Sequence, residues 1–253
     1  MLNIYLPEKG RHHVLALSAL LILVSPARAN TDYVVNGGFE TTTNGNGQLT
    51  FNTVATGWTN LSDGHGHDGY NFLFAPGTAD TTGATGDSGN LKLWGPNDGS
   101  ANGLPATSPD GGNYIAADGA YEIGAIQQQI SGLTIGVEYS LGYWWAGAQQ
   151  TGFSGITTEQ WDVTLGDLTQ NTVPVTDPSH GFTGWQRQTF TFIADSVNPL
   201  LSFLAVGTPT GEPPFSLLDG VTLQQTPEPG TFALIGLGLV AVPLAARLRR
   251  RRS

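Results

Sequence analysis

Two short segments carry the side chains best suited to catalysis or metal binding. Gly86-Asp87-Ser88-Gly89 places a serine in a glycine-flanked loop, with Asp63 and His65 upstream. A nucleophilic serine needs a base within hydrogen-bond reach and an oxyanion hole, and this spacing supports neither. Eighteen acidic side chains between positions 30 and 226 could include the carboxylate pair of a glycoside hydrolase, because that separation is a spatial quantity. We therefore expect a non-enzymatic protein, with a glycoside hydrolase as the third reading.

The other segment is His65-Gly66-His67-Asp68. Two imidazoles at i and i+2 of an extended segment face the same way and could hold a transition metal with Asp63 or Asp68. Glycine-flanked polar stretches are more often solvated loops, which is the reading we favour. A calcium loop beginning at Asp98 is excluded, because Pro109 occupies the twelfth position, where a bidentate acid is needed.

The N-terminal region has the pattern of a targeting signal. Basic and polar residues at 9–13 precede an apolar run, Val14–Val24, that is too short to span a bilayer comfortably. Ala27 and Ala29 place small side chains where a signal peptidase reads them. The sequence predicts a signal helix within 1–29, cleaved after Ala29; the alternative is a buried helix of the domain.

The C-terminal region has three parts in a fixed order. Pro227, Glu228 and Pro229 precede an apolar stretch, 232–246, and a cluster of arginines at 247–252 that would stop at the cytoplasmic face. The order closely resembles the PEP-CTERM sorting signal of bacteria that make exopolysaccharide. The resemblance implies cleavage near Pro-Glu-Pro by an exosortase-type membrane protease, after transient anchoring through a hydrophobic helix within 227–253. An ordinary C-terminal anchor would show the same hydropathy.

Between the two terminal regions the charge is strongly negative. Residues 30–226 contain two basic side chains, Lys92 and Arg187, against eighteen acidic ones, a net charge near −16. Such a surface repels nucleic acid and anionic lipid, and leaves cations and neutral glycans as natural partners. The chain has no cysteine, so burial of apolar surface has to stabilise this exported domain.

The interior of the domain reads as strands separated by turns. Apolar residues alternate with polar ones in 137–145, 160–165 and 189–192, which is the pattern of half-buried strands. The run 200–206 is almost continuously apolar and predicts a central strand covered on both faces. Many short strands with long polar loops indicate an antiparallel β-sandwich, so the fold class is all-β.

The two ends of this domain carry a second resemblance. Val35–Glu40, followed by Gly57-Trp58, and Leu217–Leu223 are similar to the first and last strands of jelly-roll domains of the galactose-binding and carbohydrate-binding-module kind. The resemblance implies a jelly roll over 30–226. It also implies a role in binding sugars.

Two tryptophans are candidates for glycan contact. The apolar residues of 137–145 occupy odd positions, so Trp144 should project from the face opposite Trp145 and could offer its ring to a neutral sugar. The alternative is that a second sheet or a loop covers this face. Trp94, among glycines, is the second candidate.

One acid in the closing strand predicts a cation site. Asp219 alternates with apolar residues at 215, 217, 221 and 223, so its carboxylate should face the same side as theirs and needs compensation. Similar jelly-roll domains bind calcium through acids of their first and last strands, which implies a structural calcium held by Asp219, Glu40 and backbone carbonyls. The alternative is that Asp219 accepts backbone N–H bonds in a turn.

Together these features predict an exported protein displayed on the cell surface or in the extracellular matrix. Its expected role is non-enzymatic binding of a neutral glycan or exopolysaccharide. The alternative is a purely structural matrix component.

Overall fold

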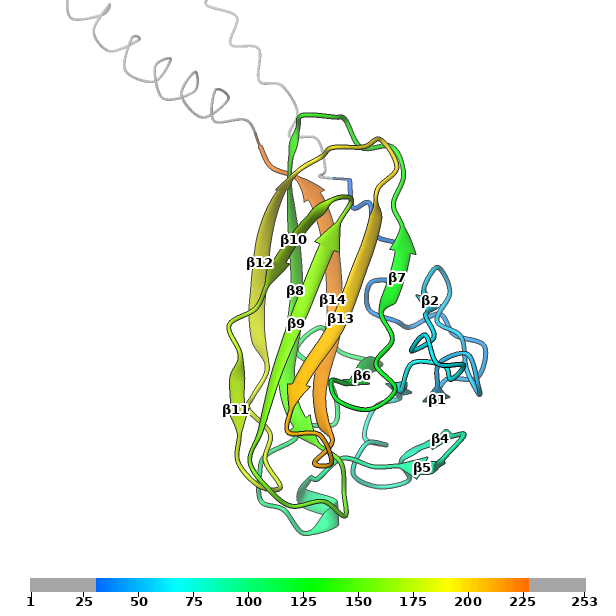
Figure 1. The fold of residues 1–253 in the computed structure, drawn as a ribbon, viewed down its shortest axis with the longest axis vertical. Helices are drawn as coiled ribbons and strands as arrows, with labels where there is room; N and C mark the ends of the chain where they lie inside the picture. The colour runs from blue at the N-terminus through cyan, green and yellow to red at the C-terminus, as the bar shows by residue number, and fades with distance from the viewer. Residues whose placement is uncertain (1–30, 228–253) are drawn as a thin grey trace, which may run out of the picture.

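Residues 31–227 are described by a computed structural model, in which two antiparallel sheets pack face to face (Figure 1). The first sheet has the order β1 (Gly47–Gln48), β3 (Asn71–Phe74), β6 (Tyr114–Asp118), β14 (Pro214–Gln225), β8 (Glu138–Gln149) and β12 (Gln186–Ile193). The second has the order β10 (Leu168–Asn171), β9 (Thr157–Leu165), β13 (Leu200–Thr208), β7 (Ile126–Gln129) and β2 (Thr59–Asn60), with β11 (Val175–Asp177) also paired to β9. A hairpin of β4 (Ala84–Gly86) and β5 (Gly89–Leu91) and a 3-10 turn, η1 (Pro96–Asp98), lie beside the sheets.

The connectivity confirms the predicted jelly roll. From β6 onward the chain changes sheet at each long strand: β6, β8, β12 and β14 lie in the first sheet, and β7, β9 and β13 lie in the second. The short strands β10 and β11 only pair with β9. This alternation between two sheets is typical of a jelly roll. It places the last strand, β14, between β6 and β8, with hydrogen-bonded partners on both sides.

The main core fills the space between the sheets, as the alternating patterns predict. Odd-numbered side chains of β8 point inward, and Trp145 is only 2% exposed. They pack against the inward side chains of β9 and β13, with Phe203 edge-on to both Tyr143 and Trp161. Members of this core from the long strands include Tyr139, Leu141, Tyr143, Trp145, Trp161, Val163, Leu165, Phe190, Phe192, Leu201, Phe203, Leu218, Val221 and Leu223.

Strand β13 overturns one prediction. The continuous apolar run 200–206 predicts a strand covered on both faces, and this is wrong. The strand is central in its sheet, but Leu200 is 40% exposed and Val206 is 36% exposed, whereas Leu201 and Phe203 are buried. The outer side chains of β13 stay at the surface. The continuous apolar run therefore does not indicate a second layer that covers this strand.

A β-bulge in β14 overturns a second prediction. The register between β14 and β8 shifts between Asp219 and Thr222, and Gly220 takes φ +58° there, a conformation that favours glycine. The extra residue reverses which way the later side chains point. Phe215 and Leu217 therefore pack outside the first sheet, whereas Val221 and Leu223 pack between the sheets.

The outer side of the first sheet carries a second apolar cluster. Segments 79–104 and 182–185 form a covering layer over the small side chains Ala146 and Ala148 and over Phe215 and Leu217. Leucines at 91, 93 and 104 and the aromatic rings of Phe182 and Trp185 supply the layer. Glycine-rich loops that carry no periodic pattern thus complete the domain.

The two ends of the described chain meet at one end of the sandwich (Figure 1). The Tyr33 N–H donates to the Leu223 carbonyl at 2.9 Å, and the Leu223 N–H donates to Asp32 Oδ1 at 2.9 Å. The first and last segments are therefore fixed side by side, with β14 running the length of the first sheet between them and the opposite end.

The predicted terminal helices lie outside the described residues. This applies to the signal helix within 1–29, with its cleavage residues Ala27 and Ala29, and to the hydrophobic helix within 227–253. Of the sorting residues, Pro227 is described, and Glu228 and Pro229 are not. Within 31–227, no helix is both long enough and apolar enough to span a membrane.

Candidate functional site

Trp144 lies on the outer face of the first sheet, opposite the core. Its neighbour in sequence, Trp145, is buried between the sheets, and Trp144 itself is half-buried. The Arg187 guanidinium, from the register partner on β12, lies 5.7 Å from the centre of the indole ring. This cation–π contact orients the ring. Arg187 also donates to the Gly220 carbonyl at 3.2 Å and to Thr222 Oγ1 at 3.4 Å, which links β12 to the bulge in β14.

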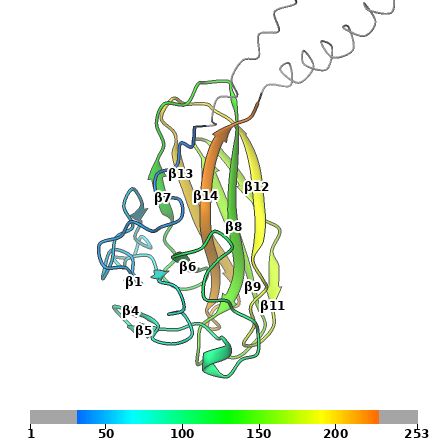
Figure 2. The ribbon, with the colours of Figure 1, turned by 180° about the vertical axis from the view of Figure 1, so that it is seen from behind.

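A polar surface extends from Trp144 along the upper parts of β12, β8 and β14. The strand registers define its rows: Arg187 and Trp144 first, then Thr189, Gly142 and Thr222, then Thr191, Ser140 and Gln224. We call these eight residues the open face. Figure 2 shows that no other strand crosses the upper parts of β14, β8 and β12 on this side. Gly142 contributes no side chain, and the end of the Arg187 side chain covers it, with Nη2 2.5 Å from the point where a Cβ would lie.

Trp94 lies far from Trp144, beside the loops at the other end of the sandwich. Its ring stacks on His180 with centroids 4.0 Å apart, and its indole N–H donates to the Phe153 carbonyl at 2.9 Å. Ser100 and Asn102 both donate to the His180 carbonyl. Trp94 thus joins three loops, and one face of its ring is already occupied by His180.

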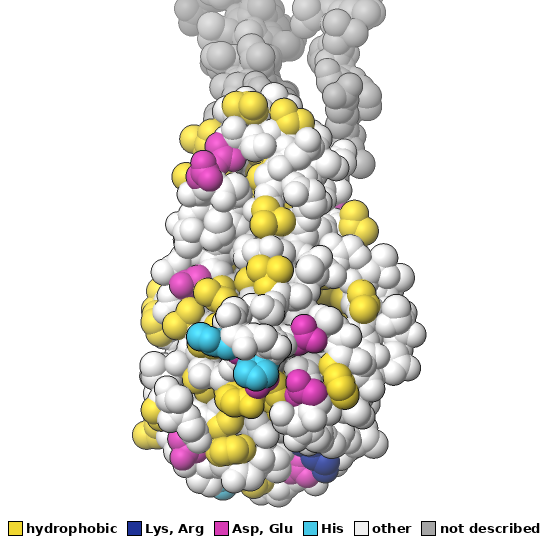
Figure 3. Space-filling view, turned by 45° about the vertical axis from the view of Figure 1, so that its right-hand side comes forward, with side chains coloured by type: hydrophobic (Ala, Val, Ile, Leu, Met, Phe, Trp, Pro, Cys, Tyr) yellow, Lys and Arg dark blue, Asp and Glu magenta, His cyan; other side chains and the backbone are white. Residues whose placement is uncertain are grey.

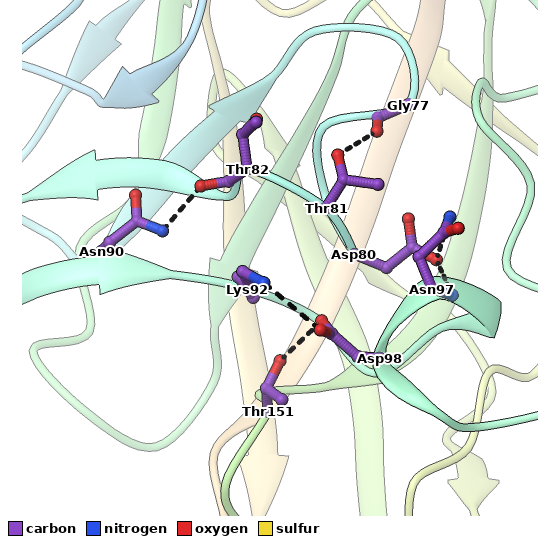
Figure 4. A network of polar contacts seen from close by, with 9 residues as sticks. All are labelled: Gly77, Asp80, Thr81, Thr82, Asn90, Lys92, Asn97, Asp98 and Thr151. Carbon is purple, nitrogen blue, oxygen red and sulfur yellow. Dashed lines mark hydrogen bonds and ion pairs between the residues drawn. The ribbon is translucent and has the colours of Figure 1, made fainter.

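A polar network holds the same end together (Figure 4). Lys92 pairs with Asp98 at 3.2 Å, and Asp98 also lies within reach of the Thr151 hydroxyl. Asp80 accepts hydrogen bonds from the backbone and side chain of Asn97. Asp98, which imitates the start of a calcium loop, is therefore neutralised by a lysine.

Asp219 is fully buried, as its apolar neighbours predict. Its Oδ2 accepts a hydrogen bond from the Ser108 hydroxyl, whereas its Oδ1 has no hydrogen-bond partner. Burial raises the pKa of Asp219 to about 8, against the lowering effects of the Ser108 and Gly220 hydrogen bonds. Asp110 and Glu40 raise this pKa further, so negative charge gathers here without a basic partner.

The structure brings Glu40 close to Asp219, as the sequence predicts, and adds Asp110. A Cβ placed on Gly38 would lie 3.1 Å from Asp110 Oδ2, 3.9 Å from Asp219 Oδ1 and 3.9 Å from Glu40 Cγ. Glu40 Oε1 also accepts the Asn113 N–H at 2.8 Å. As they stand, no three His, Asp or Glu side chains of residues 31–227 are close enough together to hold a metal ion. The calcium site therefore stays a prediction.

The histidine segment 65–68 forms a loop at the surface, the outcome we favour from sequence. His67 Nδ1 lies 2.9 Å from Asp63 Oδ2 and 3.7 Å from Glu122 Oε1. The hydrogen bond to Asp63 raises the pKa of His67, and the same bond lowers the pKa of Asp63 to about 2. Figure 3 shows histidine side chains among acidic and hydrophobic ones on this face.

Ser88 lies in the turn of the β4–β5 hairpin, and its hydroxyl contacts the Tyr121 hydroxyl. Among the residues the structure describes, no hydrogen bond joins Ser88 to His65 or His67. The β4–β5 turn therefore pairs Ser88 with neither of these histidines.

Two residues of these sites were missed by the sequence interpretation. Arg187 is one of the two basic residues of the domain. The scarcity of basic residues was a signal that each of them has a fixed partner. Asp110 follows Ser108-Pro109 and precedes two glycines, a pattern that predicts a turn and nothing about which acids it meets.

Comparison with known families decides the nature of the C-terminal region. Residues 225–251 match the model of the PEP-CTERM protein-sorting motif. This chain carries a PEP-CTERM sorting motif. The predicted resemblance is confirmed, and the PEP-CTERM motif marks an exported protein that is sorted to the cell surface. The match begins at Gln225, the last residue of β14, so the motif follows the sandwich without a linker.

Several solved structures are similar to this chain. The CBM22-1 xylan-binding domain from Paenibacillus barcinonensis Xyn10C is 10% identical, covers 80% of this chain and 99% of its own, and has a TM-score of 0.37. The C-terminal CBM6 of LamC, a laminarinase from Zobellia galactanivorans, is 10% identical over 47% of this chain and 84% of its own, with a TM-score of 0.31. The K2 cleaved adhesin domain of Lys-gingipain is 14% identical over 79% and 99%, with a TM-score of 0.39. No curated protein matches the chain.

Proposed function

We propose that this protein is displayed outside the cell as a non-enzymatic glycan-binding module, and that its open face binds a neutral polysaccharide. The observation that supports this most is the half-exposed Trp144 ring, held by Arg187 at the end of a flat polar strip. Aromatic rings bury a large apolar area when they stack on the C–H face of a sugar. The hydroxyls of the open face can then exchange hydrogen bonds with the sugar hydroxyls.

The charge of the domain favours a neutral ligand over an acidic one. Residues 30–226 carry a net charge near −16, and Arg187 is already engaged with Trp144, Gly220 and Thr222. An acidic chain would meet long-range repulsion, whereas a neutral chain would not. The three rows of the open face follow one another along β12, β8 and β14. The face is therefore suited to a segment of an extended chain.

An array of neutral and acidic glycans, probed with the full-length protein, tests this proposal. We expect the protein to bind neutral polysaccharide. Trp144→Ala should lose about 2 kcal/mol or more of the binding free energy, as for other aromatic anchors. Trp94→Ala is the matched control and should bind as the wild type does. Loss of binding in the Trp94 variant alone would move the site to the other end, and binding that ignores both changes would remove the aromatic platform.

We propose further that a signal peptidase removes residues 1–29 and that an exosortase-type protease processes the sorting motif after transient membrane anchoring. The order of Pro-Glu-Pro, apolar stretch and arginine cluster supports this. Changing Pro227 and Pro229 together to alanine keeps the apolar stretch and the arginines, so the protein should stay uncleaved in the membrane. Unchanged release of this variant would leave simple anchoring as the explanation.

We also propose a structural calcium ion between Asp219, Asp110 and Glu40. The unpartnered Asp219 Oδ1 would coordinate this ion. The ion would also join the first segment of the domain to the last strand. Calcium at a hundred times its dissociation constant should stabilise the fold by about 2.7 kcal/mol. Asp219→Asn should abolish that gain, and Glu138→Gln, which changes an exposed acid at the start of β8, should not. Thermal unfolding with calcium and with chelator measures the effect.

A further inference from the structure

Two other acids, Glu159 and Asp177, are buried as completely as Asp219. Both are 0% exposed, and none of their four carboxylate oxygens makes a hydrogen bond of normal geometry. They come from adjacent strands: Asp177 of β11 is the register partner of Thr157, and Val175 is the register partner of Glu159. The two acids are therefore diagonal neighbours on the same inward face of the second sheet.

Glycines on the opposite side make the room that the two carboxylates fill. A Cβ on Gly147 of β8 would collide with Glu159, and a Cβ on Gly181 would collide with Asp177. These glycine segments are joined to each other, since the Thr183 N–H donates to the Gly147 carbonyl at 3.0 Å and Gly147 donates back to the Thr183 hydroxyl at 2.8 Å. The acids thus point into a closed space between β9, β11 and β8.

No positive side chain of residues 31–227 compensates this pair. Lys92 pairs with Asp98, and Arg187 lies over Trp144. His180 is close in sequence to Asp177, but its ring stacks on Trp94 and its Nε2 lies 2.8 Å from Ser154 Oγ. Burial raises the pKa of Glu159 to about 8 and that of Asp177 to about 7, and each value expresses the cost of an ionised carboxylate without a partner.

Further oxygen atoms surround the two carboxylates. The Thr157 hydroxyl lies beside Glu159, where its hydrogen bond lowers the pKa of that acid, and it accepts the Gln149 side-chain N–H at 2.9 Å. The Pro178 carbonyl oxygen and Asp177 Oδ1 both crowd the point where a Cβ of Gly181 would lie. Carboxylates, a hydroxyl and a carbonyl form the all-oxygen surroundings that calcium prefers, and histidine or sulfur ligands for a transition metal are not part of them.

We propose that Glu159 and Asp177 form a second calcium site, distinct from the one at Asp219, which ties β11 and the β11–β12 connection to the body of the sandwich. Calcium supplies the positive charge that the sequence lacks at this position. The loop that carries His180 begins directly after Asp177, so the ion also fixes the loop against which Trp94 stacks.

Calcium titrations of the full-length chain in the Asp219→Asn background test this site by itself. Calorimetry should still detect one bound ion, and at a hundred times its dissociation constant the melting temperature should rise by about 5 to 10 °C. Glu159→Gln and Asp177→Asn should each weaken binding by about tenfold or more, and Glu138→Gln should leave it unchanged. Tryptophan fluorescence should respond to calcium only in chains that retain both acids.

The opposite result is equally distinct. If the two carboxyl groups share a proton instead, calcium and chelator leave the melting temperature unchanged, and the double variant Glu159→Gln with Asp177→Asn melts above the wild type because a buried charge is gone. That outcome overturns the second site. It leaves the glycan proposal intact, because Trp144 and the open face lie on the outer side of the first sheet.

Discussion

The outer side of the first sheet has two halves, built by the same strands, that differ in polarity and in whether a second layer covers them. In the open half, β8 presents Ser140, Gly142 and Trp144 beside threonines of β12 and β14. In the covered half, β8 presents Ala146 and Ala148, and the covering layer packs on them. Two small side chains permit close approach of a second layer, whereas polar residues and one tryptophan keep the other half in contact with solvent.

The β-bulge at Gly220 lies where the two halves meet. Before it, β14 sends Phe215 and Leu217 into the covered half; after it, Thr222 reaches the open half. Asp219 and Arg187 stand on either side of Trp144 in the row at this boundary. One extra residue therefore separates a region built for stability from a region free to bind.

Removing a large side chain from the covered half should give the largest effect. Phe215 is fully buried among aromatic rings, so Phe215→Ala should lower the free energy of unfolding by about 3 to 5 kcal/mol. Thr189→Ala, in the open half, should change it by less than about 0.5 kcal/mol. Urea unfolding compares the two. Similar losses in both variants would mean that the halves do not differ as described.

Part of the pH dependence of stability should come from the covered half. Burial in this half raises the pKa of Asp118 to about 7, against two backbone hydrogen bonds. Its folded pKa lies above its unfolded one, so the folded state binds more protons and stability falls as pH rises from about 4 to about 7, by at most about 1.4 kcal/mol per pH unit. Asp118→Asn should make this slope shallower in denaturation measured at several pH values, while the buried acids Glu159, Asp177 and Asp219 still contribute to it. A slope as steep as that of the wild type would show that Asp118 does not contribute.

Adding a methyl group at Gly142, in the open half, should have the smallest effect on the free energy of unfolding. It should have a clear effect on glycan binding. A Cβ on Gly142 would lie 2.5 Å from Arg187 Nη2, the end of a flexible side chain, so the arginine has to move from its place over Trp144. Gly142→Ala should weaken glycan binding by about tenfold, or about 1.4 kcal/mol, with an unchanged fold. Thr191→Ala, at the far row, is the control. Full binding by Gly142→Ala would show that the ring needs no support from Arg187.

The sequence predicts well the side-chain directions that follow from alternation along a single strand. The inward side chains of β8, β9 and β12 were identified because each second residue repeats one environment. The position of Trp144 on the outer face followed from the same rule. The neighbours of Asp219 were partly predicted, since the direction of Phe215 and Leu217 is set by alternation and that of Val221 is set by the bulge.

What the sequence could not show depends on contacts between distant segments. The covering layer consists of loops without periodicity, and only the alanines of β8 hint that something packs there. Glu159 fits the inward pattern of β9, but an acid at an inward position says nothing about Asp177 on a neighbouring strand. The apolar run of β13 was misleading because hydrophobicity on an outer face does not require a partner.

The position of the two chain ends has a mechanical consequence. The sorting motif follows β14 directly, and β14 is the one strand hydrogen-bonded to both β6 and β8 along the first sheet. Because ladder hydrogen bonds run perpendicular to the strands, a pull on the C-terminal tail loads them together in shear rather than one after another. A module attached through this tail while its face holds a polymer would resist tension with the whole length of its central strand.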